Sequence, residues 1–296
     1  MKTQAIGRFR VDRVVETEGP FAALDFILPG LAPELVAANA DWLSPVHVEP
    51  GTGKAVMSFH AFVIRTGRHN ILVDACVGND KERPLRPNWH RQRFPFLAAL
   101  ARAGLKPEAI DVVFCTHLHA DHVGWNTRLV DGRWVPTFPN ARYVFAKREY
   151  QYWARAHKKA VAEGAEVPNH GSFADSVLPV VEAGRAILVD DDHQIEDGVW
   201  LEPAPGHTPG TCILHARDRD DHAVFLGDIL HNAAQLLRPA QSSRFCSDPA
   251  ASGRTRAKLV DRYAETDTVV LTGHFPTPTA GRIVRHGGAF RFDMAI

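Results

Sequence analysis

The chain has 296 residues, of which 45% are hydrophobic, and this suffices for one large α/β domain or two small domains with full cores. Its 34 lysines and arginines balance 34 aspartates and glutamates without a long block of one sign, which argues against nucleic acid as an obligatory partner. The first residues lack the apolar core of a signal peptide, no apolar run reaches about 18 residues, and the four cysteines have no paired spacing, so we expect a cytoplasmic protein without a membrane segment.

Short β-branched and apolar runs predict the strands, and helical spacing predicts the helices between them. Strands are expected at residues 8–16, 21–28, 55–64, 70–76, 111–115, 142–146, 186–189, 199–202, 211–216, 223–226 and 268–271, with a closing pair over 282–292. Helices are expected at residues 94–103, 147–162 and 254–264. A loop or short helix is expected over 30–52 and a loop over 164–175, and because no Gly-, Ser- or Pro-rich linker divides the chain, we expect a single domain over residues 1–296.

A run of ligand-type side chains follows the predicted strand 111–115 directly, in the sequence Thr-His-Leu-His-Ala-Asp-His from residue 116. Because side chains in an extended chain repeat every second residue, His117 and His119 are expected on the same side. If the chain then bends into a helix, Asp121 and His122 can face the same point from its first turn. Imidazoles and a carboxylate gathered in this way favour a divalent metal over the alternative of a solvated polar loop.

Three further ligand-type residues stand at rigid turns or just after strands. His207 lies in Pro-Gly-His-Thr-Pro-Gly, Asp228 follows the strand 223–226, and His274 follows the strand 268–271. Each alone has an ordinary alternative, as a turn residue, an Asx-turn or a helix cap. Together with the histidine cluster, they indicate a site on the loops beyond the strand ends of a layered α/β fold.

The combination His-x-His-x-Asp-His, Gly-His-Thr-Pro-Gly, Gly-Asp and Gly-His resembles the metallo-β-lactamase superfamily in order and spacing over residues 72–274. Residues 126–127, 134–139 and 274–281 resemble, less specifically, its branch of lactonases and methyl parathion hydrolase. The resemblance implies a four-layer αββα sandwich with a dinuclear site at one edge of two sheets. It implies one metal on His117, His119 and His207, a second on Asp121, His122 and His274, and Asp228 as the bridge.

Seven ligands without a thiolate suit two divalent ions, with zinc as the first expectation and iron, manganese or cobalt as alternatives. Two ions about 3.5–4 Å apart would share a water, and the resulting metal-bridging hydroxide would attack a carbonyl or phosphoryl centre. By analogy Asp121 and Asp228 take part in catalysis, Asp121 by orienting the nucleophile or moving a proton. His231 stands at the position where quorum-quenching lactonases often carry a tyrosine. A histidine at this position resembles the methyl parathion hydrolase type. It is expected either to hydrogen-bond a substrate oxygen or to pack nearby.

Aromatic residues in or beside these loops are expected as pocket walls and favour an uncharged, apolar substrate: Trp125, Phe173, Phe245 and Phe275. We therefore expect a dinuclear metal-dependent hydrolase that opens a small-molecule lactone or cleaves a carboxylic ester, with no nucleic acid or membrane partner. An organophosphate or phosphodiester hydrolase is the nearest alternative. A β-lactamase is less favoured, because those enzymes usually carry Cys or Ser in place of Asp228, and the complete ligand set disfavours a non-catalytic metal-binding protein. The family tendency implies a homodimer.

Overall fold

The structure is a computed structural model that describes residues 3–295, and these residues form two compact units. Unit 2 consists of Thr3–Thr17 and Phe59–His193, and unit 1 consists of Glu18–Ser58 and the chain from Gln194 onward. The chain therefore passes from one unit to the other three times, and neither unit is a single continuous segment. The single domain over residues 1–296 stays a prediction.

Unit 2 is built around a sheet whose central strands are parallel. The seven strands of the sheet are, in spatial order, β1 (Gln4–Ile6), β2 (Phe9–Ala23), β3 (Lys54–Arg65), β4 (Asn70–Val73), β5 (Val112–Phe114), β8 (Arg142–Ala146) and β9 (Ala186–Val189). The pairs β1–β2 and β3–β4 are antiparallel, whereas β4, β5, β8 and β9 are parallel to one another. Most residues of β4, β5 and β8 are buried, which explains why these strands are apolar runs without alternation.

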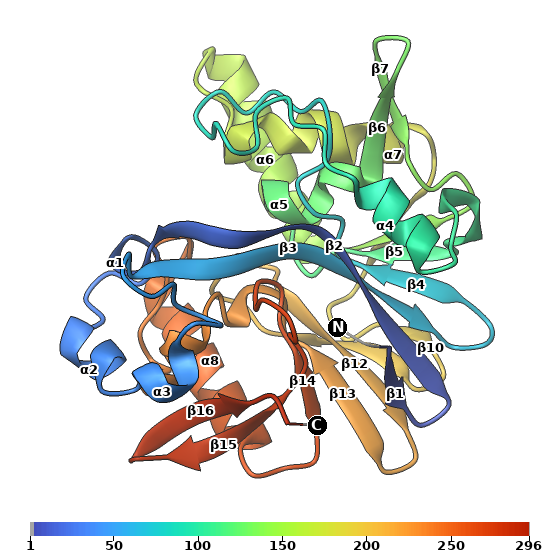
Figure 1. Cartoon of the computed structure of the whole chain (residues 1–296). Coiled ribbons are helices and arrows are strands. Elements are labelled where there is room, and N and C mark those ends of the chain that lie inside the picture. Colours follow the sequence, from blue (N-terminus) through green and yellow to red (C-terminus); the bar gives the residue numbers. More distant parts are fainter. Residues whose placement is uncertain (1–2, 296) are drawn as a thin grey trace. The chain divides into compact units, whose positions relative to one another are not determined.

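The helices of unit 2 lie on one side of its sheet (Figure 1). They are α4 (Phe96–Arg102), α5 (Ala120–Val123), α6 (Lys147–Glu163) and α7 (Leu178–Glu182), with the short turns η1 (Pro107–Ala109), η2 (Gly124–Asn126), η3 (Asn169–Gly171) and the π-turn η4 (Phe173–Val177). Apolar side chains of the sheet and helices form one core, as Leu72, Val113 and Phe145 pack with Phe96 and Val180. A hairpin of β6 (Thr127–Val130) and β7 (Arg133–Pro136) completes the unit.

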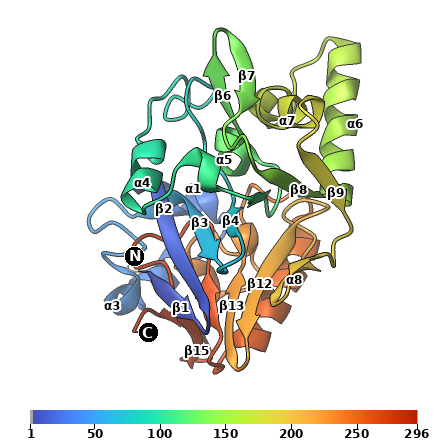
Figure 2. The same cartoon turned by 90° about the vertical axis from the view of Figure 1, so that its right-hand side faces the viewer.

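Unit 1 contains a sheet whose spatial order is β10 (Gln194–Glu196), β11 (Val199–Pro203), β12 (Cys212–Asp218), β13 (Asp221–Phe225) and β14 (Val269–Leu271). Neighbouring strands from β10 to β13 are antiparallel, as Figure 2 shows for β12 and β13, and β14 is parallel to β13. The other elements are α1 (Leu24–Ile27), α2 (Pro33–Ala37), α3 (Ala40–Leu43), η5 (Gly227–Ile229), η6 (Ala233–Leu237), α8 (Pro249–Tyr263) and the hairpin of β15 (Arg282–His286) and β16 (Ala289–Asp293). Because β13 and β14 are parallel neighbours, the residues that follow them are brought together.

Most predicted strands and helices are confirmed to within a few residues. One exception is residues 21–28, where β2 runs on to Ala23 and α1 follows, so the predicted second strand is wrong. The reason is that Leu24, Ile27 and Leu28 are buried together at helical spacing. The loop predicted over 164–175 contains η3 and the start of η4 instead. Across residues 3–295 we find no helix with both the length and the apolar character that a membrane span needs.

Candidate metal centre

The four ligand-type residues after β5 lie together within unit 2. Nε2 of His117 lies 3.0 Å from Nδ1 of His119, and the rings of His117 and His122 are 4.1 Å apart between centroids. Oδ2 of Asp121 lies 3.9 Å from Nε2 of His122. The chain bends at Thr116 and His117, is extended at His119 and enters α5 at Ala120.

Asp74, at the end of β4, orients this cluster. Its carboxylate accepts hydrogen bonds from the backbone N of Thr116 at 2.8 Å and from Oγ1 of Thr116, and it lies 3.0 Å from Nδ1 of His122. Because the hydroxyl of Thr116 donates to Asp74, its oxygen is left to accept from Nδ1 of His117, 3.1 Å away. Nδ1 of His117 therefore carries the proton and its Nε2 lone pair is available for a cation, and the Asp74 carboxylate favours the same proton position on His122.

Neighbouring side chains hold the backbone of this loop in place. Oε1 of Glu149 accepts from the backbone N of Leu118, and the Asn169 amide both accepts from Ala120 N and donates to Leu118 O. Gly124 follows α5 at a close approach between two chain segments, because a Cβ atom there would lie 1.8 Å from the carbonyl oxygen of Val77. Only glycine therefore fits this position.

In unit 1, three histidines surround the carboxylate of Asp228. Oδ2 lies 3.3 Å from Nε2 of His207 and 3.3 Å from Nε2 of His231, and Oδ1 lies 3.1 Å from Nε2 of His274. All four residues are buried. Asp228 and His274 meet because they follow the parallel strands β13 and β14, whereas His207 comes from the turn after β11.

The Nδ1 partners of His274 and His207 direct the Nε2 atoms of these two rings toward Asp228, whereas Ser243 contacts Nε2 of His231 itself. Nδ1 of His274 lies 3.1 Å from the carbonyl oxygen of Ser58 and must donate to it, so Nε2 presents a lone pair to a carboxylate oxygen. Nδ1 of His207 lies 3.6 Å from Sγ of Cys246, and Nε2 of His231 lies 3.2 Å from Oγ of Ser243. A lone pair facing a carboxylate oxygen is unfavourable unless a cation lies between them.

The loop that carries His207 depends on Gly206. Its φ of +133° is strained for any residue with a side chain, and a Cβ atom would lie 2.2 Å from the backbone N of Ser252 in α8. The loop is further fixed where Ser247 N donates to the His207 carbonyl at 2.8 Å. The flanking glycine and proline residues predicted an unusual backbone path, and this path brings the loop into close contact with α8.

The comparisons with known proteins decide the family. The family model described as the metallo-beta-lactamase superfamily matches residues 59–286, well over half of the chain. The chain belongs to the metallo-β-lactamase superfamily. Its fold is therefore the metallo-β-lactamase fold, as the motifs predicted, with the mixed strands and helices described above.

The relatives of this superfamily member are named as lactonases and hydrolases. The chain is 24% identical over 176 residues to an N-acyl homoserine lactonase of a Bacillus species, and the match spans 59% of this chain and only 60% of that protein. Among solved structures, the hydrolase AbOPH is similar with a TM-score of 0.78 at 22% identity, covering 98% of this chain and 96% of the other. The dizinc quorum-quenching lactonase AidC also has a TM-score of 0.78, at 19% identity with the same coverage.

The donor atoms of both clusters fit divalent metal ions. They are imidazole nitrogens and carboxylate oxygens, the ligands that zinc and similar ions prefer. The electrostatics of unit 1 also favour a cation at this place. Burial alone would lower the pKa of His207, but the opposite effects of Asp228 and Cys246 are larger and raise this pKa to about 9. Burial lowers the pKa of the neighbouring His231 to about 4, although Asp228 acts in the opposite direction. Asp228 therefore stabilises a cation beside His207, while His231 stays neutral.

Two of the predicted pocket residues, Trp125 and Phe275, pack in the core, and as substrate-pocket residues they stay predictions. Trp125 is stacked on Phe96 at 5.2 Å and donates from Nε1 to buried Glu16. Phe275 is fully buried and packs edge-on against His47 and Phe292. Their position in loops suggested accessibility, but each ring is covered by side chains of its own unit.

The other two predicted pocket residues differ from each other. Phe173 is also buried in the core of unit 2, where it contacts Tyr150 and His157, and as a pocket residue it stays a prediction. Phe245 is half-buried, and its ring lies 5.8 Å from that of His231 and 6.4 Å from that of Phe26. As a pocket residue, Phe245 stays a prediction.

Three residues of the centre were missed by sequence reasoning. Asp74 stands at the end of β4, one strand away from the histidine motif, and this position after a parallel strand is the signal that could have found it. Cys246 and Ser243 contact His207 and His231 from the segment before α8. Nothing in the local sequence marks these two residues.

Proposed function

We propose that this protein is a hydrolase with two divalent ions that opens lactones or cleaves carboxylic esters. The ligands of the two units would bind one pair of ions, with His117, His119 and His207 on the first, Asp121, His122 and His274 on the second, and Asp228 between them. The observation that carries this proposal is the orientation of Asp228. One of its oxygens faces His207 and the other faces His274, as a carboxylate that bridges two ions requires.

Individual residues of the chain would have separate roles in the hydrolysis of the ester. When bound, the two ions would supply a water of lowered pKa as the nucleophile and polarise the carbonyl of the ester. Asp121, at the first turn of α5, has its Oδ2 atom 3.9 Å from Nε2 of His122 and would accept or return the proton of the nucleophile. His231 is neutral and would donate a hydrogen bond to an oxygen of the substrate.

The substrate class we propose is a lactone with an apolar substituent. The curated relatives are named N-acyl homoserine lactonases, and AidC is described in complex with the product N-hexnoyl-L-homoserine. A phosphotriester is the second candidate, because a histidine rather than a tyrosine lies against Asp228 at position 231. A cytoplasmic homodimer without nucleic acid or membrane partners completes the proposal.

The test measures metal content and hydrolysis together. Protein produced with zinc, iron and manganese present is analysed for metals, and its turnover of an N-acyl homoserine lactone series, an aryl ester and a phosphotriester is measured before and after chelation. We expect about two ions per chain and lactone opening that chelation abolishes and zinc restores. Turnover of the phosphotriester alone would favour the second candidate.

Matched variants test whether a loss of metal and activity results from the missing ligand or from loss of the fold. Asp228→Ala is expected to lose metal and activity, whereas Asp220→Ala, in the exposed turn between β12 and β13, is expected to keep both. Wild-type protein without bound metal, or activity indifferent to chelation, would refute the proposal.

A further inference from the structure

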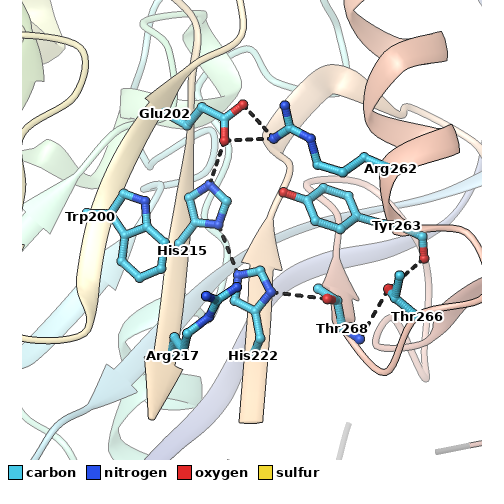
Figure 3. A pocket seen from close by; sticks show the side chains of 9 residues that line it. All are labelled: Trp200, Glu202, His215, Arg217, His222, Arg262, Tyr263, Thr266 and Thr268. Atoms are coloured by element: carbon cyan, nitrogen blue, oxygen red, sulfur yellow. Dashed lines mark hydrogen bonds and ion pairs between the residues drawn. The ribbon is translucent and has the colours of Figure 1, made fainter. Parts of the chain in front are cut away.

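A second cluster of chemically active side chains in unit 1 contains none of the predicted metal ligands. It lines a cavity of about 350 Å³ between the strands β11, β12 and β13 and the end of α8 (Figure 3). This volume is at the lower end of the roughly 300–1,000 Å³ that small-molecule sites occupy. The lining side chains are Trp200, Glu202, His215, Arg217, His222, Arg262, Tyr263, Thr266 and Thr268.

Strand register gathers these side chains on one face of the sheet. Trp200 is paired with His215 across β11 and β12, and Arg217 is paired with His222 across β12 and β13. Glu202 and Arg217 stand two residues beyond Trp200 and His215, so they share that face. Helix α8 supplies Arg262 and Tyr263 from its last turn.

A continuous chain of hydrogen bonds links the two histidines to Arg262 and Glu202 on one side and to Thr268 on the other. Nη1 of Arg262 donates to both Glu202 oxygens at 2.7 and 2.8 Å, and Oε2 of Glu202 lies 3.2 Å from Nε2 of His215. Nδ1 of His215 lies 3.0 Å from Nε2 of His222, whose Nδ1 lies 3.1 Å from Oγ1 of Thr268. The Glu202 carboxylate accepts, so Nε2 of His215 donates to it. Burial lowers the pKa of both His215 and His222, so both rings are neutral, and Nδ1 of His215 then accepts from His222, which accepts from the hydroxyl of Thr268.

The three rings are parallel and form one aromatic surface, in which the hydrogen-bonded rings of His215 and His222 lie side by side and Trp200 is stacked on His215. His215 and His222 are nearly parallel at 5°, with centroids 5.3 Å apart, and Trp200 is stacked on His215 at 4.7 Å and 5°. Burial and Arg217 lower the pKa of His222 to about 4, so this surface stays uncharged at neutral pH. Tyr263 lies on the other side of the pocket, with its ring 6.2 Å from that of His222 (Figure 3).

One positive charge in this pocket is not compensated. Glu202 is engaged by Arg262 and His215, whereas Arg217 is exposed and forms no ion pair with any residue from 3 to 295. Its guanidinium carbon lies 5.8 Å from the centre of the Trp200 ring. With two arginines, one glutamate and two neutral histidines, the pocket carries a net positive charge beside an aromatic surface.

We propose that this pocket binds a small aromatic carboxylate. The ring would stack parallel to the rings of Trp200, His215 and His222, and the carboxylate would pair with Arg217. A planar guanidinium matches a carboxylate with two parallel hydrogen bonds, and the aromatic wall selects a flat apolar body. The hydrogen-bond chain that ends at Arg262 keeps this wall rigid, so the ligand meets a preformed surface.

Benzoate is the probe, and its binding to the full-length protein is measured by isothermal titration calorimetry and ligand-observed NMR. Acetate has the charge without the ring, and benzamide has the ring without the charge. We expect benzoate to bind at least about ten-fold more tightly than either, because a charged hydrogen bond and a stacked ring each contribute to affinity. Equal affinity for acetate and benzoate, or no benzoate binding at tens of millimolar, would overturn the proposal.

Arg217→Gln removes the charge of the exposed side chain but keeps a polar end group, and it is expected to weaken benzoate binding about ten-fold or more. Arg219→Gln, in the exposed turn two residues later, is the matched control and is expected to leave the affinity unchanged. Thermal unfolding of both variants verifies their fold. The same loss of affinity in both, or in neither, would contradict the role of Arg217. Metal content is measured in parallel, and since no pocket residue is a predicted metal ligand, failure of one proposal leaves the other standing.

Discussion

Asp74→Asn tests whether the carboxylate after β4 orients the predicted ligands. The Asp74 side chain is 7% exposed, accepts two hydrogen bonds from Thr116, and lies 3.0 Å from Nδ1 of His122. In the variant, the amide oxygen can keep the Thr116 bonds, but the amide nitrogen then faces a second donor at His122. To avoid this contact the imidazole must move its proton to Nε2, and the lone pair assigned to the metal is lost.

Loss of such an orienting partner typically weakens metal binding about 10–100-fold, which corresponds to about 1.4–2.7 kcal/mol. The measurement is competition with a chelator of known affinity, combined with elemental analysis. We expect the weaker binding to affect one ion of the pair, so that dialysis leaves about one metal per chain. Asp111→Asn is the matched control, because Asp111 accepts from the backbone N of Asn70 at 2.8 Å at the other end of β4 and β5. Equal metal affinity in both variants would refute the orienting role of Asp74.

Three further predictions concern buried groups of unit 1. His47 is fully buried, has no hydrogen-bond partner for either ring nitrogen among the described side and main chains, and burial lowers its pKa to about 3. The stability that neutral His47 contributes is therefore present above pH 6.5 and is lost as the pH falls toward 3, with a loss of about 2 kcal/mol at pH 5. Urea unfolding should show that His47→Leu loses about 2 kcal/mol less stability between about pH 7 and pH 5 than the wild type does. An identical loss in both proteins would contradict this prediction. Cys246→Ala should weaken metal binding about ten-fold in chelator competition, because the thiol facing His207 is removed. Cys246→Ser should retain most of the metal affinity. Full metal affinity of the alanine variant would be evidence against a role of this contact. Gly206→Ala should lower the melting temperature far more than Gly51→Ala. A Cβ atom at position 51 meets nothing within 4 Å and adds only the strain of a positive φ, about 1 kcal/mol. Similar decreases in melting temperature for the two variants would exclude the close contact of Gly206 with α8.

The parts of the site that sequence could predict are those in which spacing along the chain fixes the geometry. The closeness of His117, His119 and His122 follows from their spacing within six residues at the start of α5, and the apolar strands follow from their composition. Asp74 and Cys246 could not be assigned, because each acts on a histidine far away in sequence. The partners that cover an aromatic ring are equally nonlocal, which is why Trp125 was placed in a pocket although it stacks on Phe96 in the core.

The interleaving of the two units has a consequence for biosynthesis. Residues 18–58 leave the ribosome early, but the rest of their unit begins only at Gln194. This N-terminal segment must therefore wait for more than half of the chain to be translated, while the unit that contains β4, β5 and β8 can already assemble. Pairings between such distant segments are slow and expose apolar surface during synthesis. We therefore expect chains arrested near residue 193 to depend on chaperones, with residues 18–58 as the part that proteases cleave first.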